Sequence, residues 1–332
     1  MKLVSYRRAD GPIRAAALLP CESRILDLHA ASAGQAGGAW PGFASTRAMI
    51  EAGAEASLGR AADLLARPPE GAILPLSDVR LMAPVPRPAQ MRDALCFEKH
   101  LVQAFQAARK VRAAASPDPA AAMAEMERLN LLSVPQTFYE QPIYYKANRF
   151  SVIGPETDVL WPAYSEVMDF ELEFGIFIGR EGCDIAVDEA DRHIFGYTIF
   201  NDFSARDAQM REMGGQLGPA KGKDFDTGNA MGPWLVTADE IPDPYDLTMI
   251  ARVNGEEWGR GNSGSMHWKF GDVLAHVSAG ETLHPGEFIG SGTVGNGCGL
   301  EQMRFLQHGD VVELEVSGLG VLRNRVLRRD RL

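Results

Sequence analysis

The sequence predicts an α+β fold, mainly β, with a small N-terminal β-rich domain over residues 1–85 and a larger domain over residues 86–332. The first observation is length, because 332 residues suggest about two domains. The second is that strand-like alternation of apolar and polar residues recurs along the chain. The third is the stretch 66–90, which contains six prolines. Proline cannot join the middle of a sheet, so we expect the domain boundary there.

Composition restricts the classes of partner. Hydrophobic residues make up 45% and charged residues 23%, as is typical of a soluble globular protein. The net charge of −11 argues against nucleic acids and anionic membranes as partners. The N-terminal apolar run is about six residues and ends at Pro20, which is too short for a signal peptide. The cysteines have no metal-binding spacing, so we expect a cytoplasmic protein with free thiols at Cys21, Cys96, Cys183 and Cys298.

The N-terminal part begins with two predicted strands. MKLVSYR and AAALLP are rich in strand formers and flank the turn sequence ADGP. Residues 45–65 have apolar residues at helical spacing, which predicts a helix. This part therefore resembles a small sheet with a helix packed on it.

A helical segment is predicted after the proline-rich stretch. From Asp93 onward, Phe97 and Leu101 follow at intervals of four residues. Asp93 suits the N-cap position, and His100 then lies on the side of this helix. Residues 120–131 predict a second helix, so we expect a helical insert over about 101–131, which would suit a lid.

The segment from Tyr164 to Gly182 predicts a strand with an acidic face. Apolar residues share one parity, and Glu171 and Glu173 share the other, so both carboxylates point the same way. Like charges on one face need either water or a cation. The chain repeats the Glu-Leu-Glu pattern at Glu313 and Glu315. The pattern alone therefore leaves both a metal site and a solvated face open.

The rest of the chain predicts strands, glycine-rich loops and one helix. GYTIF is a strand that ends near Asp202, and the following loop is dense in glycine. Asn254-Gly255 predicts a hairpin turn, and Phe270–Ser278 predicts a helix. GSGTVG spells GxGxxG, but more glycines follow where a dinucleotide-binding motif needs a helix, so we do not expect a nucleotide site.

Several motifs together resemble the fumarylacetoacetate hydrolase superfamily, in its longer, fumarylacetoacetase-type bacterial form. They occur in the family's order between Arg92 and Arg325: RDALCFEKH, MDFELEFGIFIG, FNDFSARDAQ, GKDFDTGNAMGPW, VNGEEWGRGNSG, GSGTVGNGCGLE and GDVVELEVSGLGVLRN. The resemblance implies a rolled mixed β-sandwich with peripheral helices, and a homodimer.

The resemblance also implies a divalent cation, typically Mg²⁺, with Mn²⁺ or Ca²⁺ as alternatives. Its ligands in the family match Asp93, Glu171, Glu173 and Asp202. Oxygen ligands without a nearby His or Cys cluster suit these hard cations and not zinc. Asp169 has the same parity as the two glutamates, and it is either a residue at the entry of the strand or one that supports the metal ligands. Glu313 and Glu315 have no such companions, so we assign them to a solvated face.

The hydrolases of this family activate water with a His–Glu pair, which matches His100 and Glu301 here. Glu281 and Glu287 are alternatives to Glu301 in the same region. Lys223 matches the family lysine that faces the substrate, with Lys221 as the nearby alternative. The resemblance implies that Gln209 contacts the substrate through its amide and Thr293 holds a substrate carboxylate.

The sequence departs from the fumarylacetoacetase pattern at two positions in the substrate pocket. Leu95 and Met213 stand where those enzymes have tyrosines, so we expect a more apolar pocket. The arginine that binds a substrate carboxylate in the family has four possible counterparts here: Arg109, Arg112, Arg149 and Arg206.

We therefore expect a metal-dependent hydrolase that cleaves a carbon–carbon bond in a β-diketo acid. The substrate would be an acylpyruvate or a fumarylacetoacetate-like acid, in the breakdown of aromatic compounds. One alternative is a decarboxylase, hydratase or isomerase acting on 2-oxo acids at the same metal site. Another is a non-catalytic protein that binds a small keto acid.

Overall fold

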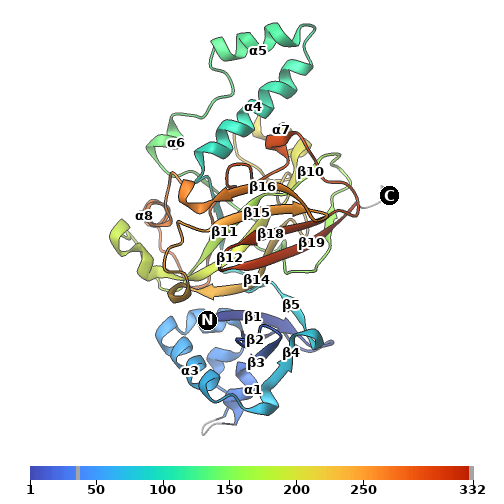
Figure 1. Cartoon of the computed structure of the whole chain (residues 1–332). Helices are drawn as coiled ribbons and strands as arrows, with labels where there is room; N and C mark the ends of the chain where they lie inside the picture. Colours follow the sequence, from blue (N-terminus) through green and yellow to red (C-terminus); the bar gives the residue numbers. More distant parts are fainter. Residues whose placement is uncertain (35–37, 329–332) are drawn as a thin grey trace.

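Two mixed sheets form the body of the protein (Figure 1). The computed structural model describes residues 1–34 and 38–328, so the predicted end of the larger domain at 329–332 lies outside the described residues. The larger sheet has twelve strands, with β4-β3-β2-β1-β14-β12-β11-β17-β6-β7 as its main path. The smaller has five, in the order β16-β15-β18-β19-β9. Mixed sheets with peripheral helices confirm the predicted fold class.

Five strands of the larger sheet belong to the N-terminal part: β1 (Lys2–Arg7), β2 (Arg14–Leu18), β3 (Arg24–Asp27), β4 (Ile73–Pro75) and β5 (Arg80–Met82). The others are β6 (Met91–Ala94), β7 (Tyr144–Lys146), β8 (Val152–Ile153), β11 (Leu172–Ile178), β12 (Ile194–Asp202), β14 (Asn229–Thr237) and β17 (Phe288–Gly290). The five-stranded sheet contains β9 (Val159–Trp161), β15 (Thr248–Val253), β16 (Glu256–Asn262), β18 (Val311–Val316) and β19 (Gly320–Arg328). A separate short pair is formed by β10 (Met168–Asp169) and β13 (Ser204–Ala205).

The N-terminal part shares its sheet with the rest of the chain. β1 pairs antiparallel with β14, and Leu3 lies opposite Leu235. The predicted helix over 45–65 is in fact two helices, α2 (Thr46–Glu51) and α3 (Ala54–Ala66). They are separated by Gly53, whose φ of 87° lies in the left-handed region that glycine adopts without strain. The division at residue 85 remains a prediction.

The central strand β11 is buried along its whole length. Phe174 and Ile176 belong to the core between the two sheets, whereas Phe177 packs in the core under the N-terminal part. At Gly175 a Cβ would come within 2.3 Å of the Phe288 ring, so glycine lets β17 pack closely on β11. This close packing helps to keep Glu173, the acidic residue of β11, buried.

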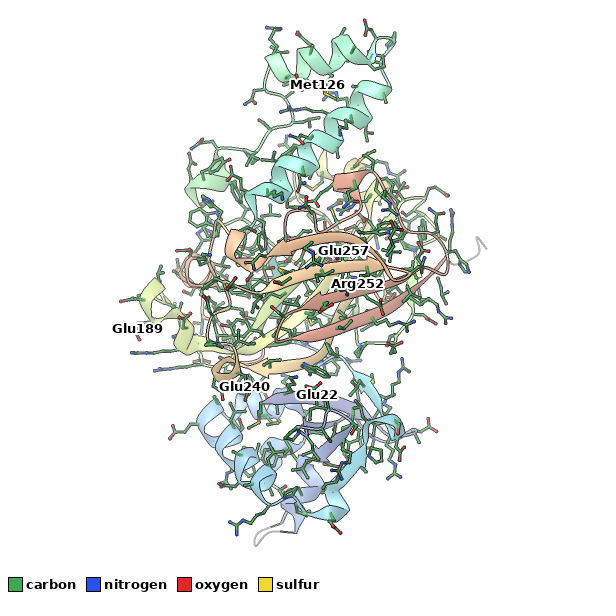
Figure 2. The ribbon with its side chains drawn as sticks, in the orientation of Figure 1. Glu22, Met126, Glu189, Glu240, Arg252 and Glu257 are labelled. Atoms are coloured by element: carbon green, nitrogen blue, oxygen red, sulfur yellow. The ribbon has the colours of Figure 1, made fainter. Side chains whose placement is uncertain are left out.

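The five-stranded sheet confirms two predictions. The turn between β15 and β16 has positive φ at Asn254 (53°) and Gly255 (81°), as a two-residue hairpin requires. Glu313 and Glu315 on β18 are half-exposed, and Glu315 pairs with Arg252 at 2.6 Å. Figure 2 shows Arg252 on this sheet, away from the N-terminal part. The second Glu-Leu-Glu pattern therefore lies on a solvated face.

One helix start was predicted wrongly. Residues 91–94 form β6, and α4 (Glu98–Ala114) begins at Glu98, not at Asp93. Asp93 is therefore no N-cap, because pairing of β6 with β17 and β7 overrides the local helical spacing. Helices α4 and α5 (Pro119–Arg128) form a hairpin that projects from the body (Figure 1). Met126 of α5 is buried on the side that faces α4 (Figure 2).

The remaining helices lie around the sheets: α1 (Leu28–Ala33), α6 (Thr137–Glu140), α7 (Arg206–Met213) and α8 (Phe270–Ser278). Helix α8 has the bounds that the sequence predicts. Over residues 1–34 and 38–328, no helix combines the length and the apolar character needed to cross a bilayer.

Candidate active site

Three of the four predicted metal ligands meet in the interior. Asp93 on β6, Glu173 on β11 and Asp202 at the end of β12 each offer an oxygen, and these oxygens lie within 4.8 Å of one another. All three side chains are buried. The ladder β12-β11-β17-β6 brings them together, because each strand pairs with the next. We call these three residues the carboxylate cluster.

Hydrogen bonds satisfy the carboxylate cluster only in part. Within residues 1–34 and 38–328, Glu173 Oε2 and Asp202 Oδ1 are buried without a hydrogen-bond partner. Burial, followed by the charge of Asp202, raises the pKa of Asp93 to about 8. Burial raises the pKa of Asp202 to about 6, although Lys223 opposes the shift. Crowded oxygen ligands with unpaired atoms fit a hard divalent cation such as Mg²⁺ or Mn²⁺.

Glu171, the fourth predicted ligand, lies beside this cluster in a different environment. Its carboxylate pairs with Lys223 and, at 2.8 Å, with Arg206. Burial would raise the pKa of Glu171, but the charges of Lys223 and Arg206 lower it to about 2. Lys223 also contacts Asp202 at 2.7 Å, so it links Glu171 to the carboxylate cluster. Its part in holding a cation remains a prediction.

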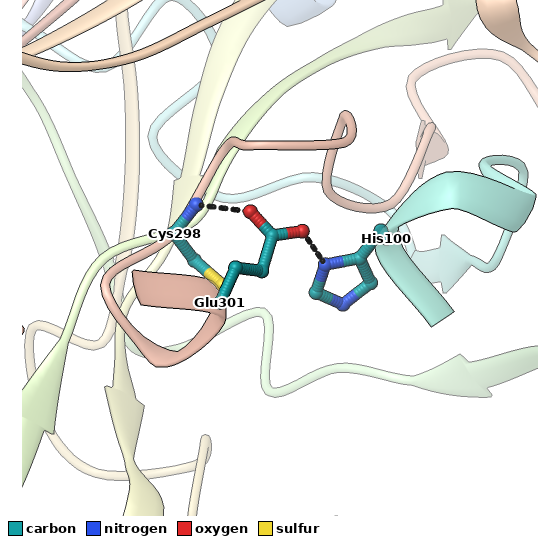
Figure 3. A group of neighbouring side chains, drawn as sticks. All are labelled: His100, Cys298 and Glu301. Carbon is teal, nitrogen blue, oxygen red and sulfur yellow. Dashed lines mark hydrogen bonds and ion pairs between the residues drawn. The ribbon is translucent and has the colours of Figure 1, made fainter. Parts of the chain in front are cut away.

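The predicted base and its partner are in contact (Figure 3). His100 lies in the first turns of α4, and Glu301 lies in the short turn η7 (Leu300–Gln302). His100 Nδ1 is 2.9 Å from Glu301 Oε1, and both side chains are buried. A carboxylate at Nδ1 keeps the proton on that nitrogen and leaves Nε2 able to accept another. The alternatives Glu281 and Glu287 instead pair with Arg92.

Asp169 fixes the turn that carries Glu301. It is fully buried, and its carboxylate accepts the N–H groups of Gly299 at 2.8 Å and Leu300 at 2.9 Å. The same carboxylate pairs with Arg206 at 2.7 Å, and Arg206 in turn pairs with Glu171. Asp169 therefore connects the His100–Glu301 pair to Glu171 through Arg206, which favours a supporting role over that of a strand-entry residue.

Two predicted substrate-binding residues lie at the site. Gln209 on α7 is half-buried and accepts a hydrogen bond from Arg206 at 3.0 Å. Thr293 is buried, and its hydroxyl donates to Glu173 Oε1 at 3.2 Å. Gln209 thus contacts Arg206, which pairs with Glu171, and Thr293 contacts Glu173 of the carboxylate cluster.

The two positions that depart from the family pattern are both at least partly exposed to solvent. Leu95 follows β6 directly and is half-buried, whereas Met213 at the end of α7 is 51% exposed. Of the four candidate arginines, Arg206 lies at the site. Arg109 and Arg149 donate to backbone carbonyls elsewhere.

Tyr145 is a site residue that sequence reasoning missed. Its hydroxyl donates to Asp202 Oδ2 at 2.5 Å. Burial and the charges of Asp202 and Asp93 raise the pKa of Tyr145 well above its usual range. The local sequence, YYK at residues 144–146, gives no sign of a functional role at this position. The missing signal is the pairing of β7 with β6, which sets Tyr145 directly opposite Asp93.

Comparisons with known proteins give a consistent family. Residues 91–327 match the family model described as fumarylacetoacetate (FAA) hydrolase, C-terminal. The chain is 40% identical over 189 residues to the mitochondrial oxaloacetate tautomerase FAHD2A of Homo sapiens. That match covers 57% of this chain and 60% of the human protein, so this chain spans less than two thirds of that relative.

Two solved structures extend the likeness to the whole fold. A 5-carboxymethyl-2-hydroxymuconate delta-isomerase from Mycobacterium smegmatis is 25% identical, with a TM-score of 0.68. The match covers 99% of this chain and 100% of the isomerase. A maleylpyruvate hydrolase from Sphingobium sp. SYK-6, in complex with manganese(II) and pyruvate, is 22% identical with a TM-score of 0.71. This match covers 99% of this chain and 100% of the hydrolase, and shows a shared fold.

Proposed function

The chain belongs to the fumarylacetoacetate hydrolase family, and from that premise we propose that it is a metal-dependent hydrolase. Its substrate is a β-diketo acid of the acylpyruvate or fumarylacetoacetate-like kind, in which one carbon–carbon bond is cleaved. The observation that carries this proposal is the buried His100–Glu301 pair, in a protein that also holds the carboxylate cluster. A rigid pair of this kind is suited to taking a proton from water.

The carboxylate cluster, with Glu171 beside it, supports a divalent cation as cofactor. Mg²⁺ or Mn²⁺ bound there would supply a Lewis acid and orient the oxygens of a 2-oxo acid. We propose Mg²⁺ as the native ion, because the cluster consists of oxygen ligands only.

The chain's own residues account for the proton transfers. His100 Nε2 takes a proton from water while Glu301 stabilises the imidazolium. The hydroxide adds to the acyl carbonyl carbon, and the bond from this carbon to the methylene carbon breaks. The electron pair leaves as the enolate of the 2-oxo acid, which His100 then protonates at carbon. We propose that Lys223 and Gln209 stabilise the negative charge on oxygen.

A direct test measures cleavage of an acylpyruvate through the loss of its ultraviolet absorbance. The assay is run on protein that has been stripped of metal by a chelator, and again after Mg²⁺ is added back. We expect activity only with the metal, and we expect His100→Ala to abolish it while the fold remains. Full turnover by His100→Ala would refute His100 as the base.

Tautomerisation or isomerisation of a 2-oxo acid is the second candidate function. It is favoured by the 40% identity to an oxaloacetate tautomerase and by the likeness to an isomerase at 25% identity. The same His100–Glu301 pair would then move a proton between carbon and oxygen without water. NMR of oxaloacetate and acylpyruvates incubated with the protein separates the two, since only hydrolysis gives two acids as products.

The proposal extends to the setting of the enzyme. We propose a homodimer that acts in the cytoplasm, in the breakdown of aromatic compounds. Light scattering on the purified protein tests the assembly, and fractionation of cells tests the compartment.

A further inference from the structure

A second group of potential metal ligands is connected to the carboxylate cluster through Glu171, whose backbone bridges to Cys298 and whose carboxylate shares Lys223 with Asp202. His100, Cys298 and Glu301 each offer a ligand atom, and these atoms lie within 4.8 Å of one another. Figure 3 shows the Cys298 side chain next to that of Glu301, which points toward His100. The proposed hydrolysis uses His100 and Glu301 but gives no task to the thiol.

This group differs from the carboxylate cluster in chemistry. It combines nitrogen, sulfur and oxygen, which suits Zn²⁺, Cd²⁺ or Co²⁺, whereas three carboxylates suit Mg²⁺. Tetrahedral zinc places such ligand atoms about 3.3–3.6 Å apart. His100 Nδ1 and Glu301 Oε1 are already 2.9 Å apart. With 4.8 Å as the largest separation, shifts of about 1 Å complete the geometry.

The thiol is held in place by the fold. Cys298 is 1% exposed, its N–H donates to Glu301 Oε2 at 3.3 Å, and its backbone bridges to Glu171. Cys96 is the other buried thiol, and among the residues described it belongs to no group of three potential ligands. The arrangement is therefore specific to Cys298.

We propose that His100, Cys298 and Glu301 form a binding site for a thiophilic divalent cation such as Zn²⁺, separate from the carboxylate cluster. Binding releases the thiol proton of Cys298 and shifts the imidazole proton of His100 from Nδ1 to Nε2, so that the cation binds the freed Nδ1 and the thiolate, with water as a fourth ligand. Because Glu301 then supports the cation and not the imidazole, the protein loses its base. The inhibitory effect rests on the proposed function, whereas cation binding does not.

The binding test uses Cd²⁺, because its bond to a thiolate gives an ultraviolet charge-transfer band. The exposed thiols are first removed in a Cys21→Ser/Cys183→Ser protein, which is loaded with excess Mg²⁺ to fill the carboxylate cluster. Titration with CdCl₂ should give one equivalent of the band. Adding Cys298→Ser should abolish it, and adding Cys96→Ser, the matched control, should leave it unchanged. A band that survives Cys298→Ser, or disappears with Cys96→Ser, would overturn the proposal.

The activity test compares Zn²⁺ inhibition of the same proteins in excess Mg²⁺. Measured against each protein's own uninhibited rate, Cys298→Ser should need at least tenfold more Zn²⁺ for half-inhibition. Equal inhibition of both proteins would mean that zinc acts elsewhere, and the proposal would fail. Should serine unfold the protein, Cys298→Ala serves in its place. If no substrate is turned over, the proposed function fails, while the Cd²⁺ band still decides the binding site.

Discussion

At the scale of single residues, partners decide what a buried carboxylate does. Glu171 and Glu173 are two positions apart, point to the same side and are both buried. Glu171 has Lys223 and Arg206 as partners, and its pKa falls to about 2. Burial and three neighbouring carboxylates raise the pKa of Glu173 well above its usual range. Glu171 is thus already paired with cationic side chains, whereas Glu173 is surrounded by carboxylates and suits binding of a cation.

We expect Glu301→Gln to lower kcat by about 10- to 100-fold, with KM little changed. The amide keeps the shape of the side chain but removes the charge that stabilises a protonated His100. Steady-state kinetics on the proposed substrates measures the effect. Glu313→Gln on the solvated strand is the matched control and should be as active as the wild type. A loss confined to KM would contradict the assigned role.

We expect Tyr145→Phe to lower the free energy of unfolding by about 1.5–3 kcal/mol, the usual value of a buried hydrogen bond to a charged group. The lost bond is the one from the Tyr145 hydroxyl to Asp202. Tyr139 makes a bond of similar length, 2.6 Å, to Glu98 at an exposed position. Tyr139→Phe is therefore the control and should change stability by less than about 0.5 kcal/mol. Urea unfolding compares the two, and equal effects would refute the argument.

At the scale of elements, local patterns predict those parts of the fold that local contacts determine. The Asn254-Gly255 hairpin and helix α8 depend on turn chemistry and periodicity within a few residues. The strand β6 was missed, because its partner β17 lies far along the chain, with Asp93 opposite Gly290. No local sequence pattern indicates the pairing of β6 with β17. The helical spacing after Asp93 therefore predicts a helix that starts too early.

The η7 turn gives an element-scale prediction. A Cβ on Gly299 would lie 1.9 Å from the Arg304 carbonyl oxygen and 2.6 Å from Asp169 Oδ1. Gly299→Ala should therefore displace the turn that carries Glu301, abolish activity and destabilise the protein by about 1–3 kcal/mol.

The control for this turn is Gly59 in helix α3, where a Cβ meets nothing within 4 Å. Gly59→Ala should stabilise the protein by about 0.4–1 kcal/mol, because it restricts the unfolded chain. Thermal melts and kinetics of both variants measure the contrast. Full activity in Gly299→Ala would show that the turn does not position Glu301.

At the scale of the whole molecule, the site gathers residues that the sequence keeps far apart. Asp93, Glu173 and Asp202 come from three strands, and Glu301 comes from a late loop. Charge alternation alone did not separate the strand that carries Glu173 from the one that carries Glu315. The family resemblance predicted that Asp93, Glu173 and Asp202 belong to one site. The antiparallel and parallel pairing of β12, β11, β17 and β6 brings them together. Tyr145 stayed hidden because only the sheet, not the sequence, sets it opposite Asp93.

Because these carboxylates are buried close together, the stability of the metal-free protein depends on pH. The pKa of Asp93 rises from its ordinary value of 3.8 to about 8, and that of Asp202 to about 6. Between pH 4 and pH 8 the folded state therefore holds protons that the unfolded state has released. Stability consequently falls as pH rises through this range.

A bound cation replaces those protons. Mg²⁺ should therefore raise the melting temperature of the metal-free protein more at pH 8 than at pH 5. At about 100 times its Kd, Mg²⁺ would add about 2.7 kcal/mol to the free energy of unfolding. Asp93→Asn should abolish the Mg²⁺ shift and stabilise the metal-free protein at pH 8, since it removes one repelling charge. Glu313→Gln should behave as the wild type. Scanning fluorimetry with chelator or Mg²⁺ at both pH values measures these effects. A Mg²⁺ shift that persists in Asp93→Asn would place the cation outside the carboxylate cluster.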